Sequence, residues 1–335
     1  MSKLVSRRLS VIAATLFFLG GFAVADAEIL RAPGGGTVRA LVLGVNEYPR
    51  LGPGAQLHGA TADAQDIAAA LAKDDVKVNL ILNGAATRAR VVDAMNELVK
   101  VAQPGDLVFI SFAGHGMQTP EYPRWKGLSG NGASEQIALS DFNFSGAGAG
   151  EIIVNIEMRA WLSRLNAKGA DSILVMDAAF GGGMRGADRA SGALRSSLVS
   201  GSADAADREK FTGIPMTDKE ARADVAAMPH VTFLGGATTN SVVPEMPGLD
   251  PRDPSVPRGA LSYYVARVLE GGASVDGVVT RKSLFEFVLQ NVGEATNSRQ
   301  FVDVRPNSDE AAVLEKPVFA FGDAPVLKPK PTENP

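Results

Sequence analysis

Short apolar segments alternate with amphipathic segments along most of the chain. The segment 39–46, RALVLGVN, is a continuous apolar run typical of a strand buried on both faces of a sheet. From about Thr61 to Lys73, apolar residues recur at the three- and four-residue spacing of a helix. The same alternation predicts further strands at 76–82, 106–112, 172–177, 230–235 and 317–321, and further helices at 87–102, 155–168, 260–270 and 283–292.

This alternation predicts an α/β fold with a mainly parallel sheet of roughly six strands and helices on both faces. We expect one domain over residues 38–323, interrupted by two long surface loops at 181–229 and 244–259. The tail 324–335 holds four prolines and is expected to be disordered. In such sheets, functional residues collect at the carboxyl ends of the strands.

The N-terminus has the pattern of an export signal. Lys3, Arg7 and Arg8 precede an uncharged, largely apolar stretch, and Ala25-Asp26-Ala27 fits a cleavage site between small residues. We therefore expect residues 1–27 to be a signal peptide and the mature protein to be periplasmic or secreted, without membrane contact. The alternative is an uncleaved N-terminal anchor.

Composition excludes several functions. The formal net charge of −4 argues against a nucleic-acid binder, because such proteins carry a basic surface. The chain has no cysteine, which excludes disulfides, thiolate metal sites and thiol catalysis for the sequence as written. With only three histidines besides, no zinc site is expected, and no metal site is predicted.

Two predicted strands end in residues suited to chemistry. The strand 106–112 leads into Gly114-His115-Gly116, where the glycines leave the backbone open to a ligand. The strand 172–177 ends at Asp177, followed by Ala178 and Ala179. A histidine in a tight turn and a carboxylate that caps a helix are the structural alternatives for His115 and Asp177.

Together these two segments resemble the caspase-like cysteine peptidases, and metacaspases and their bacterial relatives more than animal caspases. That family places a catalytic histidine in a Gly-His-Gly turn and its nucleophilic cysteine two residues after an Asp. The resemblance extends in order over about residues 38 to 305, through further segments at 39–48, 57–64, 235–245 and 259–263. It implies a three-layer α/β sandwich.

The resemblance also implies roles for the turn residues. His115 would support the nucleophile, and the backbone N–H groups of Gly116 and residue 179 would bind the oxyanion. Ala179 occupies the nucleophile position, so the chain as written should not hydrolyse peptides, since losing a nucleophile costs about 10⁶ in kcat. Two hypotheses remain: a cysteine endopeptidase in which Ala179 was engineered, or a natural pseudopeptidase that binds peptides or proteins.

The family pattern also implies a substrate pocket. Asp63 and Asp177 would line the S1 pocket, with Glu245 as a further candidate, and two carboxylates suit an Arg or Lys at P1 of a peptide or protein substrate. The alternative for Asp63 is a first-turn carboxylate that favours its helix dipole. Some metacaspases use calcium, but no carboxylate cluster here has a spacing that predicts a calcium site.

Overall fold

The computed structural model describes residues 29–72, 76–128, 132–180, 205–237 and 242–323. The predicted signal peptide, the first part of the predicted loop 181–229 and the predicted Pro-rich tail lie outside these residues.

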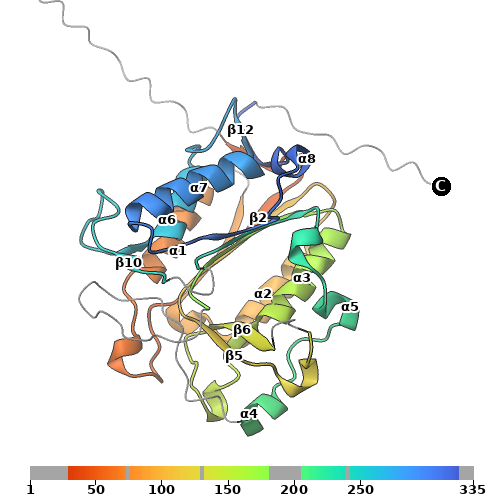
Figure 1. The fold of residues 1–335 in the computed structure, drawn as a ribbon, viewed down its shortest axis with the longest axis vertical. Coiled ribbons are helices and arrows are strands. Elements are labelled where there is room, and N and C mark those ends of the chain that lie inside the picture. Colours follow the sequence, from red (N-terminus) through yellow and green to blue (C-terminus); the bar gives the residue numbers. More distant parts are fainter. Residues whose placement is uncertain (1–28, 73–75, 129–131, 181–204, 238–241, 324–335) are drawn as a thin grey trace, which may run out of the picture.

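A six-stranded sheet forms the centre of the fold, with helices on both faces (Figure 1). Five strands are parallel to their neighbours, and the sixth, at one edge, runs antiparallel. This confirms the predicted α/β sandwich. In spatial order the strands are β13 (Asp303–Arg305), β9 (Val231–Gly235), β8 (Asp171–Asp177), β4 (Leu107–Ala113), β2 (Val38–Gly44) and β3 (Lys77–Leu82).

The sixth strand is not the one that the hydrophobic pattern suggests. The segment predicted at 317–321 does form a strand, β14 (Pro317–Phe321), but it lies in a separate antiparallel sheet between β1 (Leu30–Arg31) and β12 (Val278–Thr280). The sixth place in the main sheet belongs to β13, which pairs with β9. β13 has three half-buried residues and no apolar run, so the pattern gives it no signal.

The helices divide into two layers (Figure 1). One face of the sheet carries α1 (Ala60–Leu71), α6 (Ala260–Leu269) and α7 (Arg281–Ala295), and the other carries α2 (Arg88–Val101) and α3 (Asn155–Ala167). Each layer has its own apolar core. Burial of these stripes against the sheet is the main source of stability, because helices of this length are marginal in isolation.

A small antiparallel sheet follows β4 directly. Its strands are β5 (Gly116–Pro120), β6 (Ala133–Ala138) and β7 (Ile152–Val154). β7 leads straight into α3, so this sheet is fixed to the α2/α3 side of the molecule. It begins at Gly116 and therefore sets the position of the histidine turn.

The described parts of the two predicted loops contain short regular elements. Residues 205–229 hold α4 (Ala205–Lys210) and α5 (Asp218–Ala221), and residues 244–259 begin with β10 (Glu245–Met246) and end with β11 (Arg258–Gly259), which pair. One further helix is α8 (Ala311–Leu314), and single 3-10 turns lie at Pro53–Ala55, Asn83–Ala85, Pro123–Trp125, Gly146–Gly148 and Val225–Ala227.

Glu157 holds the second half of the predicted loop 181–229 against the body of the protein. Its buried carboxylate accepts hydrogen bonds from the Arg88 guanidinium, at 2.5 Å, and from the Ile214 N–H, at 2.9 Å. Glu157 thereby joins α2, α3 and Ile214 through one carboxylate. Its ion pair with Arg88 is shielded from water and is therefore screened less than a surface pair would be.

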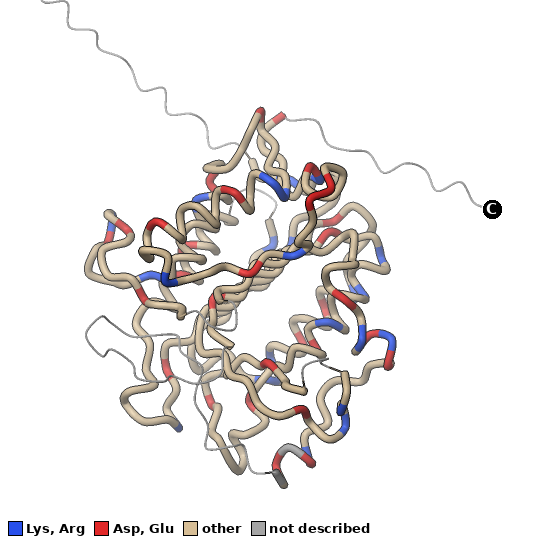
Figure 2. The backbone as a smooth tube through the Cα atoms, viewed as in Figure 1, with Lys and Arg blue, Asp and Glu red and all other residues tan. Residues whose placement is uncertain are grey.

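Charged residues of both signs are interspersed along the outer helices, whereas the central strands carry few of them (Figure 2). This distribution fits the small net charge. Among the described residues, no helix is both long enough and apolar enough to span a bilayer.

Candidate active site

The two predicted catalytic turns open at the same edge of the sheet. β4 and β8 are parallel neighbours, and their register pairs Ala113 with Asp177. The N–H of Gly114 donates a hydrogen bond to the Asp177 carbonyl oxygen at 3.5 Å. The histidine turn and the turn containing position 179 therefore begin side by side.

Gly116 and Ala179 are in close backbone contact. A Cβ placed on Gly116 would lie 2.5 Å from the Ala179 carbonyl oxygen and 2.9 Å from the Phe180 ring. Real Cβ atoms do not approach a carbonyl oxygen so closely, so this position requires glycine. The contact brings His115 next to the nucleophile position, as the resemblance implied.

The His115 ring is held by a backbone carbonyl. His115 is 2% exposed, and its Nε2 lies 2.8 Å from the carbonyl oxygen of Ala55, in the 3-10 turn Pro53–Ala55. Since a carbonyl oxygen can only accept, Nε2 must carry the proton. In the neutral ring this leaves Nδ1 as the nitrogen that can take up a proton, which is the form required of a general base.

Tyr48 holds the backbone of the same turn through its hydroxyl group. The His115 backbone N–H donates to the Tyr48 hydroxyl at 2.9 Å, and this hydroxyl donates to the Ala138 carbonyl at 3.5 Å. The two rings lie 4.8 Å apart between centroids, tilted by 50°. Tyr48 is completely buried, so it fixes both the backbone and one face of the imidazole.

The Gly116 N–H is directed away from β6. The Ala138 N–H donates to the His115 carbonyl at 3.0 Å, which makes Gly116 and Ile137 a non-hydrogen-bonded pair in the antiparallel ladder. An N–H oriented in this way at a strand end is suited to bind an oxyanion.

The three acidic residues predicted to line the S1 pocket are fully buried and close together. Asp63, Asp177 and Glu245 are each no more than 1% exposed. Both oxygens of Asp63 accept from the Gly259 N–H at 3.1 and 3.0 Å, and Oδ2 of Asp177 accepts from the Ser262 N–H at 3.0 Å. Both carboxylates thus lie at the N-terminus of α6.

Glu245 lies at the N-terminus of α1, as Asp63 and Asp177 lie at the N-terminus of α6. Its two oxygens accept from the backbone N–H groups of His58 and Gly59 at 2.9 and 2.8 Å, and Gly59 is the N-cap residue of α1. Glu245 also pairs with Gly259 across β10 and β11. All three carboxylates therefore accept hydrogen bonds from backbone N–H groups at the N-terminus of a helix, where negative charge is favourable.

Asp63 has the first-turn position that was predicted as its structural alternative. It lies in the first turn of α1, as a dipole-stabilising carboxylate would, and its oxygens reach α6 instead of its own helix. The structure brings Asp63, Asp177 and Glu245 to one place on the α1/α6 side of the site.

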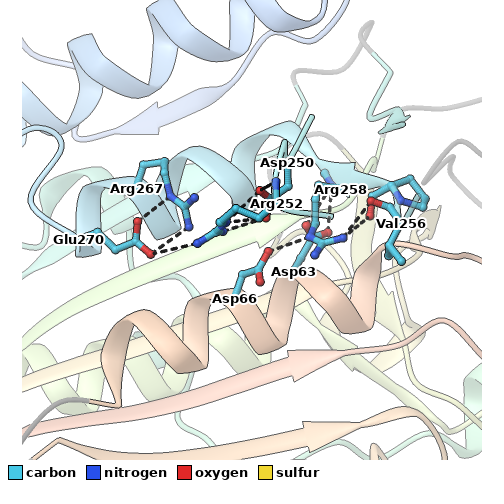
Figure 3. A network of polar contacts seen from close by, with 10 residues as sticks. Asp63, Asp66, Asp250, Arg252, Val256, Arg258, Arg267 and Glu270 are labelled. Carbon is cyan, nitrogen blue, oxygen red and sulfur yellow. Dashed lines mark hydrogen bonds and ion pairs between the residues drawn. The ribbon is translucent and has the colours of Figure 1, made fainter. Parts of the chain in front are cut away.

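A network of arginines and carboxylates borders this cluster (Figure 3). Arg258, 5% exposed, donates through Nε to Asp66 of α1 at 2.7 Å and through a terminal nitrogen to the Val256 carbonyl at 2.9 Å. It thereby fixes β11 and the neighbouring Gly259. Further out, a side-chain hydrogen bond from Arg252 lowers the pKa of Asp250 to about 2.

The described residues contain no side-chain cluster typical of a metal site. Within the ranges that the structure describes, no group of three or more His, Asp or Glu side chains is arranged to hold a metal ion.

The strands β4 and β8 thus end side by side, one in the turn that holds buried His115 and the other in the turn that holds Ala179, at the edge of the sheet where functional residues collect. The chain matches the family model of the caspase domain over residues 37–307. It therefore belongs to the caspase-domain family.

Similar proteins agree with this assignment. Metacaspase-2 of Trypanosoma brucei brucei is 36% identical over 123 residues, and Metacaspase-1A of Aspergillus oryzae is 31% identical over 121 residues. Each match covers 33% of this chain, and it spans 33% and 27% of those two proteins, respectively. The chain thus shares about a third of its length with these metacaspases.

Among solved structures, protein GSU0716 from Geobacter sulfurreducens has a TM-score of 0.55 and 19% identity, covering 85% of this chain and 99% of that chain. At this identity the likeness concerns the fold alone.

Three supporting residues were not predicted from the sequence. Ala55 acts through its carbonyl group, which every residue has, so no residue type could signal it. Tyr48 and Arg258 act through contacts with residues 67 and 192 positions away in the chain, which no local pattern encodes.

Proposed function

We propose that this chain is the caspase domain of an exported cysteine-type endopeptidase that cleaves after Arg or Lys, and that it binds but does not hydrolyse such substrates while Ala occupies position 179. A methyl group cannot attack a carbonyl, so the chemistry is lost although the surrounding site is formed.

The observation that supports this function best is the hydrogen bond between His115 Nε2 and the Ala55 carbonyl. It selects the ring tautomer in which Nδ1 can accept a proton, and it does so next to the turn that holds position 179.

The predicted preference for basic P1 residues depends on Asp63 and Asp177. Each carboxylate can accept about four hydrogen bonds, so bonds to backbone N–H groups leave it able to accept further ones from a substrate. A guanidinium or ammonium group can donate charge-assisted hydrogen bonds to two carboxylates at once.

The direct test is the Ala179→Cys protein, assayed with peptide reporters that carry Arg, Lys or Asp at P1. We expect hydrolysis of the Arg and Lys reporters and none of the Asp reporter. The unchanged chain and the Ala179→Cys/His115→Ala double variant serve as inactive controls. Cleavage of the Asp reporter alone would show that the pocket assignment is wrong.

Export is tested separately. We expect protein expressed with its full N-terminus to accumulate in the periplasm or medium, and its first residue to be Glu28 by N-terminal sequencing. An intact N-terminus in a membrane fraction would indicate the uncleaved anchor instead.

A natural pseudopeptidase that acts as a peptide- or protein-binding module is the second candidate, and Ala179 itself favours it. The codon for residue 179 in the source gene decides between them: cysteine excludes the natural pseudopeptidase, and alanine excludes a thiol protease. A folded Ala179→Cys protein that binds basic peptides without cleaving them would also favour the binding module.

A further inference from the structure

A cavity of about 340 Å³ lies between α3 and the sheet, on the face opposite α1 and α6. Its interior is apolar and includes Leu162 and Met158 of α3 and Met176 of β8. Its polar lining comes from half-buried residues of β6, α3 and the edge strand β13. The carboxylates of Asp63, Asp177 and Glu245 do not line it, so it is distinct from the predicted substrate pocket.

Two hydrogen-bond acceptors in this cavity have no donor among the described residues. Oδ1 of Asn155 is inaccessible to solvent and accepts no hydrogen bond. The carboxylate of Glu135 likewise makes no hydrogen bond or ion pair with the described part of the chain. A buried acceptor without a donor is costly, and such groups in native proteins call for an explanation such as a bound ligand.

Both acceptors line the cavity from neighbouring elements. Glu135 of β6 directly precedes Gln136, which pairs with Val154, the last residue of β7. Asn155 directly follows Val154 and is the first residue of α3. Glu135 and Asn155 therefore both lie next to the pair Gln136–Val154, where one donor group could contact both oxygens.

The charge around the acceptors favours a cation. Burial and the nearby Asp303 raise the pKa of Glu135, whereas Arg159 lowers it. Asp303 is paired with Arg305 at 2.8 Å, and Arg159 is shared with Asp224 and Glu121 as well as Glu135. Glu135 and Asp303 line the cavity together with Arg159 and Arg305, and the attraction of Arg159 to Asp224 and Glu121 adds negative charge nearby.

We propose that this cavity binds a small primary amine, with an apolar body between α3 and the sheet and an ammonium group between Glu135 and Asn155. An ammonium group has three N–H donors and no acceptor, which matches two acceptors and an acidic surrounding. The apolar interior matches a hydrocarbon or aromatic body.

The location gives such a ligand contact with the candidate active site. Phe180 lines the cavity, and its ring also lies against the backbone of Gly116. A bound amine would therefore touch the residue that directly follows position 179. The binding itself does not depend on a nucleophile and can be measured with the chain as it stands.

The test uses 4-phenylbutylamine as the probe and 4-phenylbutan-1-ol as its neutral counterpart, with binding followed by calorimetry and by NMR of methyl-labelled methionines. We expect the amine to shift the methyl signals of Met158 and Met176 and to leave that of Met95 on α2 unchanged. The alcohol should bind about tenfold more weakly, since it loses the charge-assisted hydrogen bond.

Glu135→Gln should weaken amine binding about tenfold and leave alcohol binding nearly unchanged. The matched control is Glu286→Gln, on an exposed position of α7, which should change neither. Equal binding of amine and alcohol, equal binding by Glu135→Gln, or no binding up to about 10 mM would overturn the proposal. So would amine binding that is lost in Asp177→Asn and leaves Met158 unshifted, because the probe would then occupy the substrate pocket.

Discussion

Nε2 of His115 lies 2.8 Å from the carbonyl oxygen of Ala55, which precedes it by 60 positions. A main-chain carbonyl group from a different segment of the chain therefore helps to orient the imidazole. A neutral partner fixes the tautomer without adding charge to the site. The tautomer of the His115 ring is therefore a property that can be measured.

NMR should show the neutral His115 ring protonated at Nε2. His230 provides a comparison within the same molecule, because its Nδ1 lies 2.9 Å from an Asp171 oxygen, which can only accept. Long-range proton–nitrogen spectra at alkaline pH should thus report opposite tautomers for these two residues. A dominant Nδ1-protonated form of His115 would contradict the structure.

Removing the Tyr48 hydroxyl should destabilise the protein by about 1–3 kcal/mol, because Tyr48→Phe leaves the buried His115 N–H without an acceptor. Urea unfolding measures the change. Tyr264→Phe is the matched control, because Tyr264 is half-buried and its hydroxyl forms no hydrogen bond with a described residue; its effect should stay within about 0.5 kcal/mol.

Gly116→Ala should force the two turns apart. The added Cβ would lie 2.5 Å from the Ala179 carbonyl oxygen, so we expect a loss of about 1–3 kcal/mol in unfolding free energy. In the Ala179→Cys background it should also lower kcat more than it raises KM. Gly150→Ala, where the new methyl group meets nothing within 4 Å, should leave both nearly unchanged. Similar effects at the two glycines would show that the close contact is absent.

Arg258→Met should cost about 3 kcal/mol, because it leaves the Asp66 carboxylate and the Val256 carbonyl without their buried donor. Lys100→Met removes an ion pair with Glu97 at 3.1 Å in which both side chains are exposed to solvent, and should cost less than about 1 kcal/mol. Comparable losses in the two variants would argue that Arg258 is more hydrated than the structure indicates.

Acid should weaken the attachment of α5 to α3. The side-chain hydrogen bond from Arg164 lowers the pKa of Glu220 from 4.5 to about 2. A lowered folded-state pKa stabilises the protein above pH 4.5, and this contribution is lost as the pH falls from 4.5 towards 2. The difference in unfolding free energy between the unchanged chain and Glu220→Gln should shrink over that interval.

The control for this pH dependence is Arg164→Met. In that background the pair no longer exists, so Glu220→Gln should have nearly the same effect at pH 6 and pH 3. A persistent pH dependence would assign the lowered pKa to the backbone hydrogen bond from Thr217 instead.

The parallel core of the sheet could be predicted from the sequence because each buried strand is itself an apolar run. Val38–Gly44 and Leu107–Ala113, for example, follow the predicted segments closely. β13 could not be predicted, because an antiparallel edge strand of three residues gains its stability from pairing with β9 and not from its own composition. β14 is itself an apolar run, so its composition predicts a strand, but composition does not specify which strands it pairs with, and it lies in the smaller sheet with β1 and β12.

The site divides in the same way. His115, Asp177 and position 179 follow from strand ends and family motifs, and the structure brings their turns together. Their supports do not follow, since Ala55 contributes only a carbonyl group and Arg258 an ion pair across distant segments. For the acidic cluster, the sequence predicts substrate binding, with a role at a helix terminus as the alternative for Asp63 and Asp177. Its bonds to the N-termini of α1 and α6 depend on tertiary packing.

The pairing of β1 with β14 brings the two ends of the described domain together. Leu30 lies opposite Phe321, so both ends of the described domain meet in one small sheet. This sheet lies near the amino ends of the central strands, where Lys316, directly before β14, contacts Asp171 at the start of β8. Any tether, leader or fused domain joined at either end therefore leaves from the same pole, and the turn that holds buried His115 lies at the opposite ends of the strands.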